Sequence, residues 1–272
     1  MPELPEVETV KNYLNDSIKN KKIKDVLILH SNIVCGKNDF FKKSLIKRKI
    51  LEIKRRGKYL IFILDKKYVI FVHLRMEGKF IFNKNKNKFS KHSRVIFFFE
   101  NGSMLIYDDS RAFGKMYIEN KKNYLSSTIL KKLGPEAIED INIDNFYNSI
   151  HSKRKCIKNI LLDQSIISGI GNIYATEILF KSKISPLTKV NKLSKKELSN
   201  ILKNSKNILL LAIKYHGCTS HSFTYANNKK GGFQNFLQIY GKNNKKCPIC
   251  KKKLIKIKIN GRGTVYCKKC QK

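Results

Sequence analysis

The segment CPICKKKLIKIKINGRGTVYCKKC, residues 247–270, decides the fold at one end of the chain. Its two Cys-x-x-Cys pairs, Cys247/Cys250 and Cys267/Cys270, have sixteen residues between them, a spacing typical of a four-thiolate zinc site. Zinc prefers a closed tetrahedron of soft ligands, and each pair places two sulfur atoms on one tight turn. We therefore predict one structural zinc ion, bound by these four cysteines.

A β-hairpin is predicted between the two pairs. Residues 255–259 alternate isoleucine with lysine, the period-two pattern of a strand with one basic face. Asn260-Gly261 is a hairpin turn signal, and residues 264–266 form the returning strand. Arg262 would then lie at the tip of the hairpin. The alternative is that the whole segment is only a small structural staple for the C-terminus.

The opening residues, Met1-Pro2-Glu3-Leu4, suggest chemistry. An initiator methionine before proline is normally removed, which would leave Pro2 as a free secondary amine. Apolar residues recur at helical spacing from position 4 to position 18, so Pro2 and Glu3 would lie at a helix N-terminus. There the helix dipole lowers the pKa of an amine and favours an ionised carboxylate, the pair that Schiff-base chemistry at a sugar carbon needs. Alternatively, both are ordinary first-turn residues.

Composition points to a polyanionic partner. The 272 residues, enough for about two domains, include 57 basic and 20 acidic side chains, a net charge of +37. Lys, Asn, Ile and Phe are all abundant, so part of this charge can reflect AT-biased coding. No signal peptide opens the sequence, and no apolar run approaches the ~20 residues of a membrane span. Seven cysteines that include a zinc-like quartet fit a reducing cytoplasm.

Two halves of the chain differ in pattern. Short β-branched or aromatic runs separated by turn residues predict an antiparallel β-sandwich over 59–64, 68–72, 79–82, 95–99 and 104–107. Apolar residues at three and four spacing predict helices over 145–151, 156–162, 172–180 and 194–215. The predicted class is α+β: an N-terminal helix plus antiparallel β-sandwich, a helical module and a zinc-bound hairpin.

A possible phosphate site opens the predicted helix at 172–180. Gly169-Ile170-Gly171-Asn172 precedes it, and glycines let a ligand approach the backbone N–H groups of a helix start. Taken alone, this short motif is equally compatible with a simple turn.

Seven motifs that occur in order make the chain resemble the bacterial formamidopyrimidine-DNA glycosylases, the 8-oxoguanine repair enzymes. The resemblance spans essentially the whole chain, and the combination is specific although no single motif is. The motifs lie at residues 2–9, 55–60, 73–78, 111–114, 171–174 and 240–242, and in the zinc segment that ends at Lys272.

The resemblance implies a base-excision repair enzyme. Such an enzyme removes oxidised purines, 8-oxoguanine and formamidopyrimidines, from duplex DNA. It then nicks the abasic site by β,δ-elimination through a Schiff base on the N-terminal proline. It would therefore be both a glycosylase and a DNA-(apurinic or apyrimidinic site) lyase, with one structural zinc ion. Its partner would be damaged double-stranded DNA, and we expect a monomer in the bacterial cytoplasm, associated with the nucleoid.

The resemblance also implies residue roles. Pro2 would attack the sugar C1′ and Glu3 would handle protons. Lys58 would donate a proton in β-elimination and Arg262 would serve δ-elimination. His92, Arg111 and Lys153 match DNA-contacting residues of the family, and Asn172 matches a phosphate-binding asparagine. Met76, Arg111 and Phe113 match a trio that fills the hole left by the extruded base. Without the resemblance, Met76 and Phe113 would be read as core residues, Lys58 as a solvated strand start and His92 as a surface histidine.

The implied domains are a catalytic β-sandwich at 1–134, a helix–two-turn–helix DNA-binding domain at 135–222, and a base-covering loop with the zinc finger at 223–272. Two departures from the family stand out. Ala112 replaces a second arginine, and Cys218 replaces a glycine before the pair Thr219-Ser220, in a loop thought to close over the flipped base.

Two rival functions follow from the same residues. An endonuclease VIII-like enzyme would prefer oxidised pyrimidines, against which Leu4 and the trio at Met76, Arg111 and Phe113 argue. A catalytically inactive zinc-ribbon DNA-binding protein is disfavoured by the intact Pro2, Glu3 and Lys58.

Overall fold

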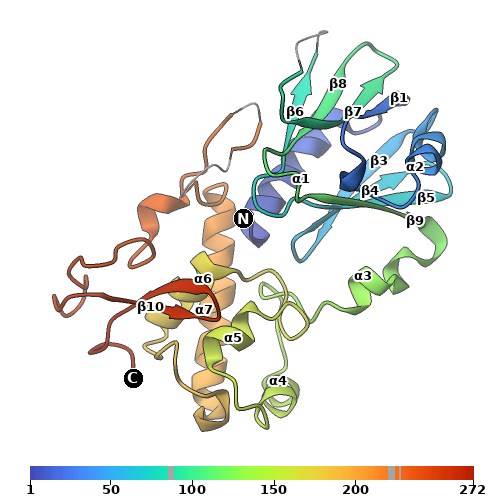
Figure 1. Cartoon of the computed structure of the whole chain (residues 1–272). Coiled ribbons are helices and arrows are strands. Elements are labelled where there is room, and N and C mark those ends of the chain that lie inside the picture. The colour runs from blue at the N-terminus through green and yellow to red at the C-terminus, as the bar shows by residue number, and fades with distance from the viewer. Residues whose placement is uncertain (85–88, 220–223, 227) are drawn as a thin grey trace. The chain divides into compact units, whose positions relative to one another are not determined.

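The computed structural model describes residues 1–84, 89–219, 224–226 and 228–272. They fall into two compact units, residues 1–131 with 215–232 and residues 132–214 with 233–272 (Figure 1). The predicted α+β class is confirmed, with two mainly antiparallel sheets, a helical module and a two-stranded hairpin. Within the described part of the chain, no helix has the length and apolar character needed to cross a membrane.

The first unit is a helix packed with two sheets. Helix α1 (Leu4–Ile18) is followed by a four-stranded antiparallel sheet in the order β1 (Ile23–Ile28), β7 (Ser93–Phe99), β8 (Met104–Asp108), β6 (Lys79–Asn83). The second sheet has the order β2 (Val34–Cys35), β9 (Lys115–Asn120), β5 (Tyr68–His73), β4 (Tyr59–Leu64), β3 (Ile50–Arg56), and is antiparallel except for the pair β2–β9. Short helices α2 (Asn38–Leu45) and α3 (Thr128–Lys131) complete the unit.

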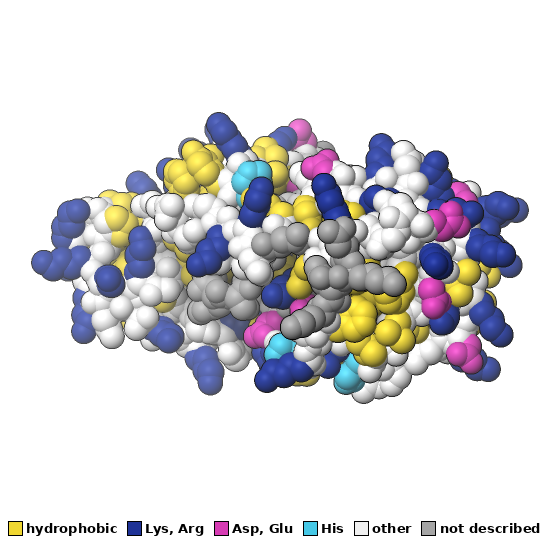
Figure 2. Space-filling view, turned by 90° about the horizontal axis from the view of Figure 1, so that it is seen from above, with side chains coloured by type: hydrophobic (Ala, Val, Ile, Leu, Met, Phe, Trp, Pro, Cys, Tyr) yellow, Lys and Arg dark blue, Asp and Glu magenta, His cyan; other side chains and the backbone are white. Residues whose placement is uncertain are grey.

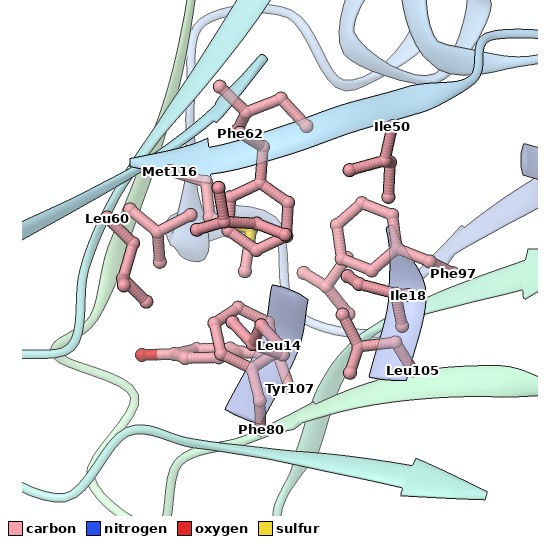
Figure 3. Packing of buried hydrophobic residues seen from close by; sticks show 14 of the residues in the cluster. Leu14, Ile18, Ile50, Leu60, Phe62, Phe80, Phe97, Leu105, Tyr107 and Met116 are labelled. Atoms are coloured by element: carbon pink, nitrogen blue, oxygen red, sulfur yellow. The ribbon is translucent and has the colours of Figure 1, made fainter. Parts of the chain in front are cut away.

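Side-chain alternation builds the core of this unit. Along β7, Val95, Phe97 and Phe99 belong to the main core cluster, whereas Ile96 and Phe98 belong to a second cluster on the other face. Burial of each large apolar side chain stabilises the fold by roughly 1.5–3 kcal/mol. The main cluster joins both sheets to α1, as Figure 3 shows for Leu14, Ile18, Phe62, Phe80, Phe97, Leu105 and Tyr107.

The second unit carries the helical module and the hairpin. Its helices are α4 (Ile143–Ile150), α5 (Ile157–Leu162), α6 (Asn172–Lys181) and α7 (Lys195–Lys214). Strands β10 (Ile255–Ile259) and β11 (Arg262–Tyr266) pair so that Ile259 lies opposite Arg262. Asn260 and Gly261 both have positive φ, as the predicted hairpin turn requires. Arg262 therefore lies at the hairpin tip, as predicted.

Candidate catalytic and DNA-binding residues

Pro2 and Glu3 lie at the start of α1, as predicted, and both are buried. The Glu3 backbone N–H donates to Oε2 of Glu6 at 2.8 Å, so one of the otherwise unsatisfied donors at the helix N-terminus has a carboxylate partner. This bond fixes the path of the chain as it enters the helix. The terminal residues are thereby held against the fold of the first unit.

Charged groups surround the terminal amine. Burial lowers the pKa of the Met1 amine below its ordinary value of 8.0, and the positive charge of Lys58 lowers it further. The carboxylates of Glu3, Glu6 and Glu77 act in the opposite direction, but the net shift is downward. An amine with a lowered pKa is more often unprotonated at neutral pH, which is the state that attacks an electrophilic carbon.

Lys58 follows Gly57 in the turn between β3 and β4, and its side chain is only 5% exposed. The reading of Lys58 as a solvated residue is therefore wrong. A lysine is rarely so buried unless its charge has partners, and the influence of Lys58 on the terminal amine places the two groups in one electrostatic environment.

Glu6 links the helix start to a distant loop. Besides accepting from Glu3, its carboxylate accepts the backbone N–H of Cys218 at 2.7 Å through Oε1. Gly217 has φ +76°, and a Cβ there would lie 2.7 Å from the same oxygen, so no other residue fits without strain. The structure accommodates Cys218 as a buried residue beside this contact. Ser220 and the other loop residues at 221–223 and 227 lie outside the described residues.

Met76 and Phe113 project outward instead of packing in the core. They are 40% and 48% exposed, so the core interpretation of both residues is wrong. The Arg111 guanidinium lies over the Phe113 ring, 4.5 Å from its centroid. The structure therefore brings Arg111 and Phe113 of the predicted trio into direct contact.

His73 supports the turn that precedes Met76. Its Nδ1 accepts the backbone N–H of Arg75 at 3.0 Å, and Arg75 has the unusual φ of +54°. Burial, with Arg75 and Lys58 nearby, lowers the His73 pKa to about 3, so the ring is neutral and Nδ1 can accept. In the sequence, His73 is marked only as the first residue of the family motif at 73–78.

His92 is held by its backbone. Its N–H donates to Oγ of Ser90 at 3.0 Å, and its carbonyl accepts the N–H of Asp109 at 2.9 Å. The side chain is partly exposed. These two hydrogen bonds fix the backbone of His92 in its turn.

Two of the predicted DNA-contacting residues, Asn172 and Lys153, lie in the second unit. Asn172 is the first residue of α6, and its Nδ2 donates to the Gly263 carbonyl at 3.1 Å, next to the exposed Arg262. Lys153 lies just after α4, where its N–H donates to the Ile150 carbonyl at 2.9 Å. Asn172 and the residue after Arg262 are therefore in contact, while Lys153 lies on a separate turn.

Lys158 is a residue that the sequence analysis missed. It is completely buried, and its Nζ donates to Oγ1 of Thr264 at 2.7 Å and to Oγ1 of Thr176 at 3.2 Å. One ammonium group thereby ties together α5, α6 and β11. The available signal was a lysine between Ile157 and the apolar residues 160–162 in a predicted helix.

The four predicted zinc ligands converge. The sulfur atoms of Cys247, Cys250, Cys267 and Cys270 all lie within 4.8 Å of one another. Burial and the neighbouring thiols raise the pKa of Cys270 to about 12, whereas the backbone N–H of Lys252 leads the hydrogen bonds that lower the Cys250 pKa to about 7. A divalent cation would remove the mutual repulsion of four thiolates, so this donor set fits zinc.

Comparison with known proteins decides the family. Three family models match: the formamidopyrimidine-DNA glycosylase N-terminal domain over residues 1–116, its H2TH domain over 133–224, and the zinc finger found in FPG and IleRS over 244–272. A formamidopyrimidine-DNA glycosylase of Mycoplasma mobile is 43% identical over 272 residues, which are 100% of this chain and 99% of that protein. The chain belongs to the formamidopyrimidine-DNA glycosylase family.

Other members of the formamidopyrimidine-DNA glycosylase family agree over the full length. The Ureaplasma parvum protein is 42% identical over 274 residues, with 100% of each chain covered. A Lactococcus lactis FPG variant in complex with Fapy-dG containing DNA has a TM-score of 0.94, 36% identity and 99% coverage of both chains. The L. lactis Fpg complex with abasic site containing DNA has a TM-score of 0.93 at the same identity and coverage.

Membership gives the protein its class of activity. It is a base-excision repair enzyme, a DNA glycosylase that also has abasic-site lyase activity, and it holds one structural zinc ion in its C-terminal finger. The predicted family and the predicted cofactor are both confirmed. The basic surface suits this class, since Lys and Arg side chains are spread over the face seen in Figure 2 while Asp and Glu are few.

Proposed function

We propose that this protein removes oxidised purines, 8-oxoguanine and formamidopyrimidines, from duplex DNA and that the amine of Pro2 is its nucleophile. The observation that carries the proposal is the buried helix start, where Pro2 and Glu3 lie next to the Met1 amine, whose pKa is lowered by burial and Lys58. Removal of Met1 would expose the Pro2 amine to the same surroundings. The L. lactis relatives bound to Fapy-dG and abasic-site DNA support the substrate class.

The chemistry follows from these groups. The neutral Pro2 nitrogen attacks C1′ of the damaged nucleotide while the bond from C1′ to the base breaks, and Glu3 transfers the protons that base loss and sugar ring opening require. The resulting iminium ion acidifies the C2′ protons. Loss of one of them expels the 3′ phosphate, with Lys58 as the proton donor of this β-elimination. Arg262 serves the second elimination, which expels the 5′ phosphate.

The remaining residues bind DNA in the proposal. Lys153, Asn172 and His92 contact the sugar–phosphate backbone, which fixes the register of the duplex without reading its sequence. Met76, Arg111 and Phe113, named here the insertion wedge, fill the space vacated by the extruded nucleotide. Apolar side chains replace the lost stacking and the guanidinium hydrogen-bonds the orphaned base.

We also propose the functional division of the chain into 1–134, 135–222 and 223–272, and a monomeric protein that works at the nucleoid in the bacterial cytoplasm. The three family models, which begin at residues 1, 133 and 244, support the division. Zinc holds the hairpin only, because four thiolate ligands leave no open position for water or substrate.

A borohydride trapping assay tests the function. The protein is incubated with duplexes that contain 8-oxoguanine opposite cytosine, thymine glycol, or no lesion, and the Schiff base is reduced. We expect a covalent adduct with the 8-oxoguanine duplex that maps to the N-terminal peptide. A stronger adduct with thymine glycol would indicate oxidised pyrimidines as the substrate. No adduct with any duplex would favour a DNA-binding protein without activity.

A further inference from the structure

The two apolar residues of the insertion wedge lie on loops that cross between the sheets. Met76 lies between β5 of the five-stranded sheet and β6 of the four-stranded sheet, and Phe113 lies between β8 and β9, which also belong to different sheets. Such crossings are not fixed by strand pairing. Something else must hold the two loops in place.

The hydroxyl of Tyr107 occupies the space between the two loops. Tyr107, on β8, is completely buried, and its hydroxyl points away from Ile18, Phe97 and Leu105 (Figure 3). A Cβ built on Gly78 would lie 2.1 Å from this oxygen, and a Cβ built on Gly114 would lie 1.7 Å from it. Both glycines therefore lack a side chain where the tyrosine hydroxyl is packed, one in the loop of Met76 and one in the loop of Phe113.

Asp109 shapes the second loop from within. It is 1% exposed, and its Oδ2 accepts the N–H of Gly114 at 2.8 Å and lies 3.5 Å from the Tyr107 hydroxyl. Its Oδ1 accepts the N–H of Arg111 at 3.1 Å. The carboxylate thus bonds the backbone on both sides of Ala112, which has φ +53°. A buried carboxylate with these donors offsets the cost of the left-handed residue.

The loops are also joined directly. The hydroxyl of Ser110 donates to Oε2 of Glu77, which places one residue of each loop in contact. Arg94 adds a further bond from its Nε to the Asp109 carbonyl at 2.7 Å. The loops of Met76 and Phe113 are therefore connected to each other, and both pack against the Tyr107–Asp109 pair.

We propose that Tyr107 and Asp109 are positioning residues that hold the insertion wedge in its working geometry. The inference rests on the proposed role of Met76, Arg111 and Phe113. A wedge that is already rigid in the free protein loses little conformational entropy when it enters the base stack. More of the free energy of its DNA contacts is then available to unstack the bases. The pair never needs to touch DNA to act in this way.

Tyr107→Phe tests the proposal because it removes only the hydroxyl. We expect excision of 8-oxoguanine to slow by on the order of five- to tenfold, the loss expected from one buried hydrogen bond. Unstacking, followed by the fluorescence of 2-aminopurine placed beside the lesion, should slow by the same factor. Cleavage of a preformed abasic site should be unchanged, because that site has no base to extrude. Asp109→Asn, which removes an acceptor from the Arg111 or the Gly114 N–H, should show the same pattern with a larger loss.

Tyr13→Phe is the matched control. Tyr13 also packs against this core, and its hydroxyl accepts the N–H of Phe82 at 3.2 Å, on β6 and outside both loops. It should change none of the three rates. If Tyr107→Phe lowers excision and abasic-site cleavage equally, or leaves unstacking at the rate of the Tyr13→Phe control, the positioning role is wrong. Met76→Ala and Phe113→Ala test the wedge separately from the residues that position it. If these variants also leave the rate of unstacking unchanged, the proposed wedge role is wrong, and the inference loses its basis.

Discussion

The N-terminal site and the zinc hairpin hold their functional residues by different means. Glu3 and Lys58 are buried against a unit whose core joins two sheets and a helix. Arg262 is exposed at the end of a two-stranded hairpin, whose cluster contains few apolar residues besides the cysteines, Phe180 and Leu254 among them. The first site depends on burial, and the second depends on a metal ion.

The difference follows from what each site must do. A nucleophilic amine needs a lowered pKa, and burial is the largest cause of the downward shift at the Met1 amine, whose surroundings the Pro2 amine would share after removal of Met1. A group that meets a phosphate needs only a charge and an orientation, which an exposed arginine on a metal-held turn can supply. We therefore expect substitutions in the first site to stop chemistry and substitutions in the second to weaken engagement of DNA.

The largest effect should come from Pro2. Pro2→Gly, or retention of Met1, should suppress the borohydride adduct while DNA affinity stays largely intact, because the amine makes the covalent bond but few of the DNA contacts. Gel trapping and a binding titration on the same preparations measure both properties. A full-strength adduct on Lys58, located by peptide mapping, would show that a different amine is the nucleophile.

Glu3→Gln should separate the two activities of the first site. The carboxylate matters most when a base must leave, so the rate of 8-oxoguanine excision should fall by about 10²–10⁴-fold. This is the rate factor that a general acid or base typically contributes. Cleavage of a preformed abasic site should keep appreciable activity. Equal losses of both activities in a folded variant would instead assign Glu3 a structural role at the start of α1.

Cys250→Ser tests the metal-dependent site. A hairpin with so small a core gains most of its folding free energy from zinc, so loss of one thiolate should release the ion and unfold the finger. DNA binding and cleavage should then decrease together. Metal analysis and circular dichroism measure the loss of zinc and the unfolding of the finger. A variant that binds DNA normally without zinc would show that the second site does not depend on the metal ion.

Arg262→Ala should be milder and should leave zinc bound. Loss of one phosphate contact lowers the slope of log affinity against log salt by about one unit. The δ-elimination product should also decrease relative to the β-elimination product. Lys256→Ala is a control on the same hairpin, because it removes an exposed positive charge and should not change the product ratio. Complete loss of zinc from Arg262→Ala would make the tip structural.

Local sequence patterns correctly predicted the helices and strands whose own residues show a clear apolar periodicity. Helix α1 and strand β4 have the predicted bounds, Leu4–Ile18 and Tyr59–Leu64, because one periodic run of apolar residues determines each. Strands β1, β2, β3 and β9 were not predicted. β3 is rich in charged residues and β9 has a single fully buried side chain, Met116, so both are specified by pairing with β4 and β5.

The site shows the same limit. Spacing alone located the zinc ligands, and the family resemblance supplied Pro2, Glu3 and Lys58. The supporting contacts were not predictable, because their partners are remote: Lys158 and Thr264 are 106 positions apart, and Glu6 and Cys218 are 212 positions apart. No periodicity or motif reports such a contact, and only the folded chain brings these residues together.

The smallest expected effect is a shift of the pH profile, and it tests whether burial is what distinguishes the first site. An amine attacks only when neutral, so trapping should fall as pH decreases through the pKa of the terminal amine. Burial and Lys58 lower the pKa of the Met1 amine. The same surroundings should lower the pKa of the Pro2 amine once Met1 is removed, so the midpoint of the acidic limb should lie below that of a free prolyl amine. Glu77 acts in the opposite direction on the Met1 amine, so Glu77→Gln should move the limb of the Pro2 amine to still lower pH. Single-turnover trapping rates from pH 5 to 9 measure both midpoints, with Glu52→Gln, an exposed carboxylate on β3, as the control that should not move. A midpoint no lower than that of the amine in a short peptide beginning Pro-Glu-Leu would mean that the surroundings do not activate the Pro2 amine. The contrast between a buried chemical site and a metal-held binding site would then lose its physical basis.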